Sequence, residues 1–288
     1  RLPEIKGKYI FGDWITRKFW AAEFDHEKTI RVEEIAVGTV KPSCFETDRQ
    51  GELLIADFTD DAQDSGIYRF VTNPATKLAS ADSSIPTFPR LLSETGLFAD
   101  TADHLPAPGV VEYSLNAPMW MNGASQVNLL AIPGTGTAVF HEHPQKMFDW
   151  FKTYVTFPNG SVLAKTYSLP TIDDPGIAER RIETQIALKD ELGEWQYYTY
   201  RWNAENTDAE LVPRSGESEK LRVPDRRVAG GERELNWQFG SRTQCRICHT
   251  PWAGETLGFI EQQLRRPKQQ HDSWRTLLDA GIVRTRIG

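Results

Sequence analysis

The sequence predicts a mainly β protein that ends in a small α-helical segment. Short apolar runs alternate with turn residues over most of the 288 residues. Nine Trp, fourteen Phe and eight Tyr favour β packing, because flat rings fit the pleated, half-buried surface of a sheet. Helical spacing of apolar residues appears only after the cysteine cluster near residue 245. The length suffices for one large domain or two ordinary ones.

The first part of the chain, residues 1–73, is predicted to form antiparallel strands joined by hairpins. Its apolar runs are interrupted by the turn sequences DRQG and DDAQDSG. The runs read KYIFGDW, KFWAAEF, IRVEEIAV, ELLIADF and GIYRFV. In residues 74–86, Pro, Ser, Ala and Thr replace the aromatic residues, which predicts a linker.

Residues 87–240 are predicted to form a second β-rich domain. Gly, Pro or Asn separates most of its strand-like runs, and the turn DELGE joins two of them as a hairpin. The runs read VVEYSLNAPMW, VNLLAIPG, GTAVF, SVLAKTYSL, RRIETQIALK and EWQYYTYRWN. The charged stretch LVPRSGESEKLRVPDRRVAGGERELNW, which follows them, is predicted to form surface loops because of its polarity.

The last part, residues 241–288, is predicted to be a small helical segment. Leu257, Ile260 and Leu264 recur at spacings of three and four, and Pro267 ends the pattern. A second short helix, SWRTLLDAG, is predicted to end on Gly281 as a C-terminal cap.

Charge and composition exclude several classes of partner. The net charge of −7 and the pI near 5.5 argue against nucleic-acid binding, which normally needs clustered Lys and Arg. No run approaches the roughly 18 apolar residues of a membrane span. The chain opens on Arg within a strand-like run, so we expect it to be a fragment of a longer protein. Three cysteines are too few for a disulfide scaffold, and Cys44 is interpreted as an isolated structural thiol.

The other two cysteines stand in the stretch SRTQCRICHTPWAG, residues 241–254. Cys245, Cys248 and His249 have the spacing at which two thiols bond both vinyl groups of a haem while the adjacent imidazole reaches the iron. The motif therefore predicts one covalently bound haem c, with His249 as the proximal iron ligand.

Two other interpretations of the motif stay open. A structural zinc site needs four ligands, whereas Cys44 is far away in the sequence and His141 and His143 provide one isolated pair. A redox-active dithiol is typical of an α/β pattern, and this chain has no βαβ rhythm. Haem is the interpretation that the spacing favours.

A haem that transfers electrons usually has a second axial ligand, typically Met or His. Met119 and Met121 lie in NAPMWMNG, a loop with aromatic and Gly residues, and are the candidate distal ligands. Met147 and His271 are further candidates, and a five-coordinate iron is also compatible with the sequence.

Several blocks of sequence, in order, resemble those of a bacterial family of exported multihaem c-type cytochromes with a β-rich region before the haem motif. The resemblance covers residues 88–285. The blocks read LLSETGLFAD, VVEYSLNAPMWMNGA, FPNGSVLAKTYSL, RRIETQIAL, YYTYRWNAENTDAELV and SRTQCRICHTPWAGETLGFIEQQLRR. Before them, KYIFGDWITRKFWAAEFD and FETDRQGELLIADFTDDAQDSGIYRFV resemble the last blade of a glucose/sorbosone dehydrogenase-like β-propeller.

The resemblance implies an electron-transfer function in the periplasm or another exported location. It assigns the thioether bonds to Cys245 and Cys248 and the proximal position to His249. It further implies a redox partner protein or an upstream dehydrogenase domain as the electron donor, with pyrroloquinoline quinone (PQQ) only in that upstream part. Family members often carry a second Cys-x-x-Cys-His motif, which this chain lacks, so one haem is expected.

Two alternatives from other functional classes accompany this interpretation. The first is a haem-containing oxidoreductase with its own substrate pocket in the β-rich region, so that the chain itself is an enzyme or part of a PQQ-type sugar dehydrogenase. The second is a carbohydrate- or partner-binding β module that a structural metal stabilises.

Overall fold

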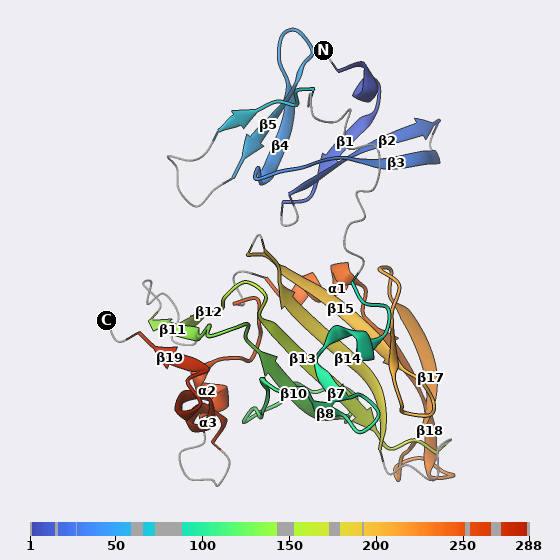
Figure 1. The fold of residues 1–288 in the computed structure, drawn as a ribbon. Coiled ribbons are helices and arrows are strands. Elements are labelled where there is room, and N and C mark those ends of the chain that lie inside the picture. The colour runs from blue at the N-terminus through green and yellow to red at the C-terminus, as the bar shows by residue number, and fades with distance from the viewer. Residues whose placement is uncertain are drawn as a thin grey trace. The chain divides into compact units, whose positions relative to one another are not determined.

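Strands form most of the ordered structure (Figure 1), so the mainly β fold class with few helices is confirmed. The chain divides into two units, Arg1–Pro86 and Thr87–Gly288. The second unit holds both the predicted β-rich domain and the predicted helical segment. The predicted linker, residues 74–86, lies outside the described residues. The computed structural model describes residues 2–14, 17–26, 28–58, 66–72, 88–142, 153–172, 179–191, 193–250, 254–265 and 272–286.

The first unit contains two three-stranded antiparallel sheets, with strand orders β1-β2-β3 and β4-β5-β6. The edge of the Phe19 ring packs on Phe45 and Phe70, with centroids 6.2 and 5.3 Å apart, which joins the two sheets. The elements are η1 (Pro3–Ile5), β1 (Tyr9–Gly12), β2 (Lys18–Asp25), β3 (Lys28–Val37), β4 (Pro42–Thr47), β5 (Leu53–Asp57) and β6 (Ile67–Tyr68). A propeller blade has four strands in one sheet, so the propeller interpretation of this unit stays a prediction.

The second unit is built on a six-stranded antiparallel sheet with the order β16-β15-β14-β13-β10-β9. The predicted hairpin at DELGE joins β14 to β15, where the Asp190 carboxylate accepts the backbone N–H of Glu194 (2.9 Å). The strands are β9 (Val110–Tyr113), β10 (Ser125–Ala131), β13 (Val162–Leu169), β14 (Arg180–Lys189), β15 (Trp195–Trp202) and β16 (Ala209–Leu211).

One face of this sheet, which we call the closed face, is covered by the segment that precedes β9. This segment comprises η3 (Leu92–Thr95), β7 (Phe98–Asp100) and β8 (Leu105–Pro106). Leu92 and Phe98 pack there on Ile186 and Trp202. The Tyr200 hydroxyl donates to the carbonyl of Pro89 (2.6 Å) and so attaches the segment to the sheet.

The opposite face, which we call the cavity face, is covered at one end by the hairpin of β17 (Glu217–Pro224) and β18 (Glu232–Phe239). The prediction of surface loops for this stretch is wrong. Alternate residues point inward: Leu221 and Val223 are 2% and 4% exposed, and Trp237 and Phe239 are buried. When only every second residue of a strand is apolar, the mean hydropathy of the strand is low. Its apolar residues nevertheless all lie on one face, which can be buried.

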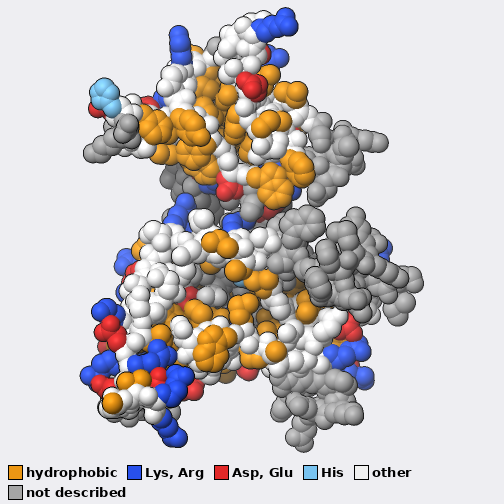
Figure 2. Space-filling view, turned by 180° about the vertical axis from the view of Figure 1, so that it is seen from behind, with side chains coloured by type: hydrophobic (Ala, Val, Ile, Leu, Met, Phe, Trp, Pro, Cys, Tyr) orange, Lys and Arg blue, Asp and Glu red, His pale blue; other side chains and the backbone are white. Residues whose placement is uncertain are grey.

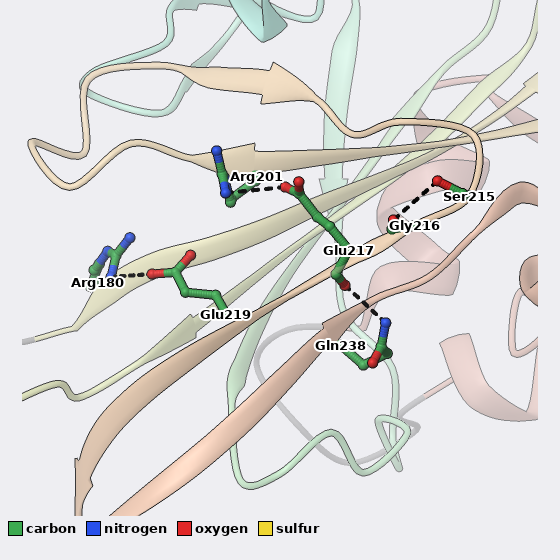
Figure 3. A network of polar contacts seen from close by, with 7 residues as sticks. All are labelled: Arg180, Arg201, Ser215, Gly216, Glu217, Glu219 and Gln238. Carbon is green, nitrogen blue, oxygen red and sulfur yellow. Dashed lines mark hydrogen bonds and ion pairs between the residues drawn. The ribbon is translucent and has the colours of Figure 1, made fainter.

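Two ion pairs further attach this hairpin to the sheet. Glu219 of β17 binds Arg180 of β14 (3.2 Å), and Glu217 of β17 binds Arg201 of β15 (3.3 Å). Figure 3 shows the two carboxylates reaching from one strand to two arginines of the sheet.

The other end of the cavity face is covered by the C-terminal segment. It comprises α1 (Arg242–Cys248), α2 (Glu261–Leu264), α3 (Ser273–Asp279) and β19 (Val283–Thr285). Strand β19 pairs in parallel with β11 (Ala138–Glu142), and β11 also pairs with β12 (Thr153–Thr156). Phe259, Leu264, Trp274 and Leu277 pack on Tyr113 and other buried aromatic residues of the β-rich part. The helical segment and the sheet therefore share one hydrophobic core.

The helices differ in part from those predicted. The first predicted helix begins only at Glu261, because Leu257 and Gly258 have positive φ and Ile260 is extended. The second is present as α3 and is followed by Gly281 at φ 70°. Helix α1 carries the cysteine cluster itself, where no helix was predicted. Within the described residues, no helix has the length and apolar character that crossing a membrane requires.

Candidate functional site

Helix α1 positions the three residues of the Cys-x-x-Cys-His motif. Ser241 begins the helix, since its Oγ accepts the backbone N–H of Gln244 (3.1 Å) while the Gln244 side chain accepts the N–H of Ser241 (2.8 Å). The helix ends at Cys248, and the backbone N–H of His249 donates to the carbonyl of Cys245 (3.0 Å). Residues three apart lie near one another on a helix surface, so Cys245 and Cys248 are neighbours on α1, and His249 follows directly after the helix.

Strand β15 fixes the orientation of α1. The guanidinium of Arg246 donates to the carbonyl of Trp195 (2.7 Å) and lies 5.6 Å from the centroid of the Tyr197 ring. The guanidinium of Arg242 lies 4.5 Å from the centroid of the Tyr198 ring. These contacts hold the helix at two points, one turn apart.

His249 is held with one ring nitrogen ready to bind a metal. Its Nδ1 bonds the backbone carbonyl of Glu255, and because a carbonyl only accepts, Nδ1 carries the proton. Nε2 of the neutral ring therefore carries the lone pair. Burial lowers the pKa of His249; the hydrogen bond to Glu255 partly opposes this effect, and the charge of Lys165 adds to it. The ring is thus kept neutral, as a metal ligand requires.

A cavity of about 420 Å³ lies on the cavity face, and Cys245 and His249 are part of its wall. Its volume lies in the range of about 300–1,000 Å³ that is typical of ligand and cofactor sites. The wall is mainly apolar and aromatic, with Tyr113, Leu163, Tyr167, Ala187 and Tyr197 from the sheet, Leu115 and Met119 from the loop after β9, and Leu257, Gly258 and Ile260 from the C-terminal segment. Seen from the side opposite Figure 1, the second unit presents apolar side chains gathered over its middle (Figure 2).

The two motif cysteines differ in exposure. Cys245 is half-buried in the cavity wall, while Cys248 is exposed and is not part of that wall. Both are free thiols, as is the exposed Cys44. Burial raises the pKa of the Cys245 thiol, and the carboxyl of Glu183 adds to the rise. A redox-active dithiol needs a lowered thiol pKa, so this environment disfavours the dithiol interpretation.

The two candidate distal ligands lie in different places. Met119 is part of the cavity wall and is 58% exposed, whereas Met121 packs against the core beneath the β17–β18 hairpin. The loop before Met119 is bound to α2, because the Asn116 amide donates to the carbonyl of Gln262 (2.7 Å) and the backbone N–H of Ala117 to the side chain of Gln263 (2.9 Å). Met119 thus shares a cavity with His249, and Met121 does not.

Other sequence candidates are only partly described. Met147, His143 and His271 lie outside the described residues. The Nε2 atom of His141 bonds the Thr156 hydroxyl (2.8 Å), and its ring stacks on Tyr154. In the part of the chain that the structure describes, no group of three His, Cys, Asp or Glu side chains is placed to hold a metal ion. This finding gives the zinc interpretation no support, whereas a haem site needs a single protein nitrogen and two thiols.

Two charged residues near the cavity were not singled out from the sequence. Lys165 on β13 is part of the cavity wall, and Glu183 on β14 is fully buried. Burial raises the pKa of Glu183 to about 7, although hydrogen bonds from Gln185 (2.9 Å) and Trp237 (2.8 Å) oppose the rise. In the sequence, each of these charged residues stands at an inward-facing position of a strand. Such a position can be recognised only when it is known which face of the strand is buried.

Comparisons with protein-family models, with curated proteins and with solved structures found no match to this chain.

Proposed function

We propose that the second unit is a c-type cytochrome module that carries one haem c on Cys245, Cys248 and His249 and transfers single electrons. The observation that carries the proposal is the cavity beside α1, whose wall includes a motif thiol and the imidazole with its oriented Nε2. When bound, haem c supplies a one-electron Fe(III)/Fe(II) couple.

The residues present fit this group in three respects. The cavity of about 420 Å³ is mainly apolar, as a porphyrin requires. The motif thiols are both free to form thioether bonds. The carbonyl of Glu255 fixes the His249 ring and makes Nε2 a better donor to iron, as hydrogen-bonded partners of metal-binding histidines commonly do.

The protein contributes orientation and exclusion of water. Helix α1, held by Arg242 and Arg246, places the Cys245 thiol and the His249 imidazole in the cavity wall, and Cys248 follows on the exposed part of the helix. Phe259, which is 1% exposed, and the aromatic wall keep the local dielectric low, and this limits the reorganisation that accompanies electron transfer. Met119 is the proposed distal ligand in preference to Met121, because only Met119 lines this cavity.

The sequence resemblance supports the proposed context. We infer that the chain belongs to an exported, periplasmic bacterial protein and that the first unit is the last blade of a glucose/sorbosone dehydrogenase-like propeller. An upstream quinoprotein-type dehydrogenase domain, which would hold any PQQ, is the proposed electron donor, and a redox partner protein or a further haem is the acceptor.

The direct test is covalent haem attachment. The chain is exported in bacteria with a cytochrome c maturation system and is analysed by mass spectrometry under denaturing conditions, together with its visible spectrum. We expect the mass of the polypeptide plus one haem. Cys245→Ser and Cys248→Ser each remove one thioether, and the double variant removes covalent attachment, whereas Cys44→Ser leaves it intact because that exposed thiol lies in the other unit.

A polypeptide mass without haem, from a sample in which a control cytochrome matures, would contradict the proposal. Reduction of the attached haem by a sugar substrate in the absence of any partner would instead favour the oxidoreductase with its own substrate pocket.

A further inference from the structure

A row of polar residues crosses the cavity face. The strand register places Asn128, Lys165, Gln185 and Thr199 side by side on β10, β13, β14 and β15. Lys165 and Gln185 are part of the cavity wall, among Tyr113, Leu163 and Ala187. A polar row in the floor of an apolar cavity is the arrangement that orients a bound molecule.

Lys165 is the only residue of this row that carries a full charge, and no described residue neutralises it. No described residue forms an ion pair or a hydrogen bond with its ammonium group. Its Nζ lies 5.8 Å from the centroid of the Tyr167 ring, and burial lowers the pKa of Lys165. Lys165 is half-buried, and a lysine that is partly removed from water is normally paired, because the transfer of a charge out of water is costly.

The acidic residue of the neighbouring strand, Glu183, already has hydrogen-bond partners. Both carboxyl oxygens of Glu183 accept hydrogen bonds, one from Trp237 and one from Gln185. On the neighbouring strand β10, Asn128 is paired with Lys165, and its Oδ1 atom is buried without a hydrogen-bond partner, so it does not neutralise the ammonium group either.

We propose that Lys165 binds a carboxylate of the molecule that occupies the cavity. A single ammonium within an apolar wall suits a singly charged anionic group on an apolar body. The carboxylate has two sources to be distinguished, a haem propionate and a free organic acid. For the haem propionate, the inference rests on the proposed function.

The first arm of the test uses the matured protein and its midpoint potential. A positive charge near the haem favours the reduced state, so Lys165→Met is expected to lower the potential by at least the 59 mV that correspond to a tenfold change for one electron. Lys165→Arg keeps the charge and is expected to stay close to the unsubstituted protein. Lys220→Met is the matched control, since Lys220 pairs with Glu234 on the exposed side of the hairpin.

The second arm uses the 288-residue Cys245→Ser/Cys248→Ser chain without haem, titrated with hexanoate and with neutral hexanamide in a calorimeter. If the carboxylate belongs to a free ligand, hexanoate binds at least tenfold more tightly than hexanamide, and Lys165→Met abolishes the difference. A lowered potential without hexanoate binding assigns the carboxylate to the haem propionate.

The outcomes separate the two proposals. If no haem attaches but hexanoate binds through Lys165, the proposed function fails while the role of Lys165 stands. The role of Lys165 is wrong if Lys165→Met lowers the midpoint potential by less than 59 mV and leaves the hexanoate affinity within twofold of the unsubstituted value. It is also wrong if the chain binds neither haem nor hexanoate.

Discussion

Two groups of polar residues, one on each face of the six-stranded sheet, differ in how many of their polar atoms have a partner. On the closed face, the His104 ring bonds Thr166 (2.9 Å), Thr166 bonds Thr184 (2.8 Å), and the Trp202 indole donates to Thr184 (2.9 Å). On the cavity face, Lys165 has no ion-pair partner among the described residues, and Asn128 keeps an unpaired oxygen.

This difference separates a structural network from a site. A chain of hydrogen bonds in which each buried group has a partner stabilises the fold and leaves no capacity for a ligand. Polar atoms that stay unsatisfied beside a cavity lower the stability of the empty protein and become favourable when a partner binds. Loss of a hydroxyl from the closed-face network should therefore destabilise the fold, whereas loss of the Lys165 ammonium group should not.

The largest expected effect is the loss of packing on the closed face. Trp202 is 1% exposed and packs between Ile186, Leu92 and the His104 ring. Trp202→Ala is expected to lower the free energy of unfolding by about 3–5 kcal/mol, from the cavity left behind and from the lost bond to Thr184. Chemical denaturation of the chain before haem attachment measures this change, and a loss below about 1 kcal/mol would show that the closed face is not the packed core inferred here.

The next effect is a pH dependence that differs between the faces. The pKa of Glu183, on the cavity face, is about 7 and lies above its ordinary value of 4.5. Its contribution to stability is therefore complete below pH 4.5 and is lost as the pH rises toward 7, a change on the order of 3 kcal/mol. Glu183→Gln should flatten the unfolding free energy over this window, because Gln imitates the neutral carboxyl.

His104 on the closed face should show the opposite sign. Burial lowers the pKa of His104 from 6.5 to about 4, and the charge of Arg181 adds to the effect. The unfolded chain then binds the proton first, so stability is lost as the pH falls from 6.5 toward 4. His104→Gln should remove this acid-side loss and leave the Glu183 window unchanged; equal slopes in both variants would mean that other groups control the pH dependence.

A smaller effect is expected when one hydroxyl of the closed network is removed. Thr184→Val keeps the shape but leaves the Trp202 indole and the Thr166 hydroxyl without this partner, at a cost of about 1–3 kcal/mol of unfolding free energy. Thr207→Val, at an exposed loop position, is the matched control. Equal losses in the two variants would contradict a stabilising role for the network.

The smallest expected effect lies on the cavity face. In the chain without haem, Lys165→Met removes an unpaired charge and loses no described contact except that with the Tyr167 ring, so we expect stability within about 1 kcal/mol of the unsubstituted chain, or slightly above it. A loss of 2 kcal/mol or more would show that Lys165 is a structural residue, and the contrast between the two faces would not hold.

The sequence by itself determined the features that depend on near neighbours in the chain. Alternation of apolar residues and turns identified the mainly β fold and the β14–β15 hairpin, and the spacing of Cys245, Cys248 and His249 identified the candidate haem motif. Local spacing suffices for these features, because a strand repeats every two residues and a helix places residues three and four apart on one face.

Only the tertiary structure decided which distant residues meet. The distinction between Met119 and Met121 and the placement of Lys165 in one cavity wall with Cys245 and His249 both depend on the packing of segments joined by long connections. The hairpin that was predicted as loops shows the same limit, since its apolar residues are recognisable as a buried face only once the sheet beneath them is in place. A register shift of one residue would turn Lys165 to the closed face, so the site is a property of strand pairing.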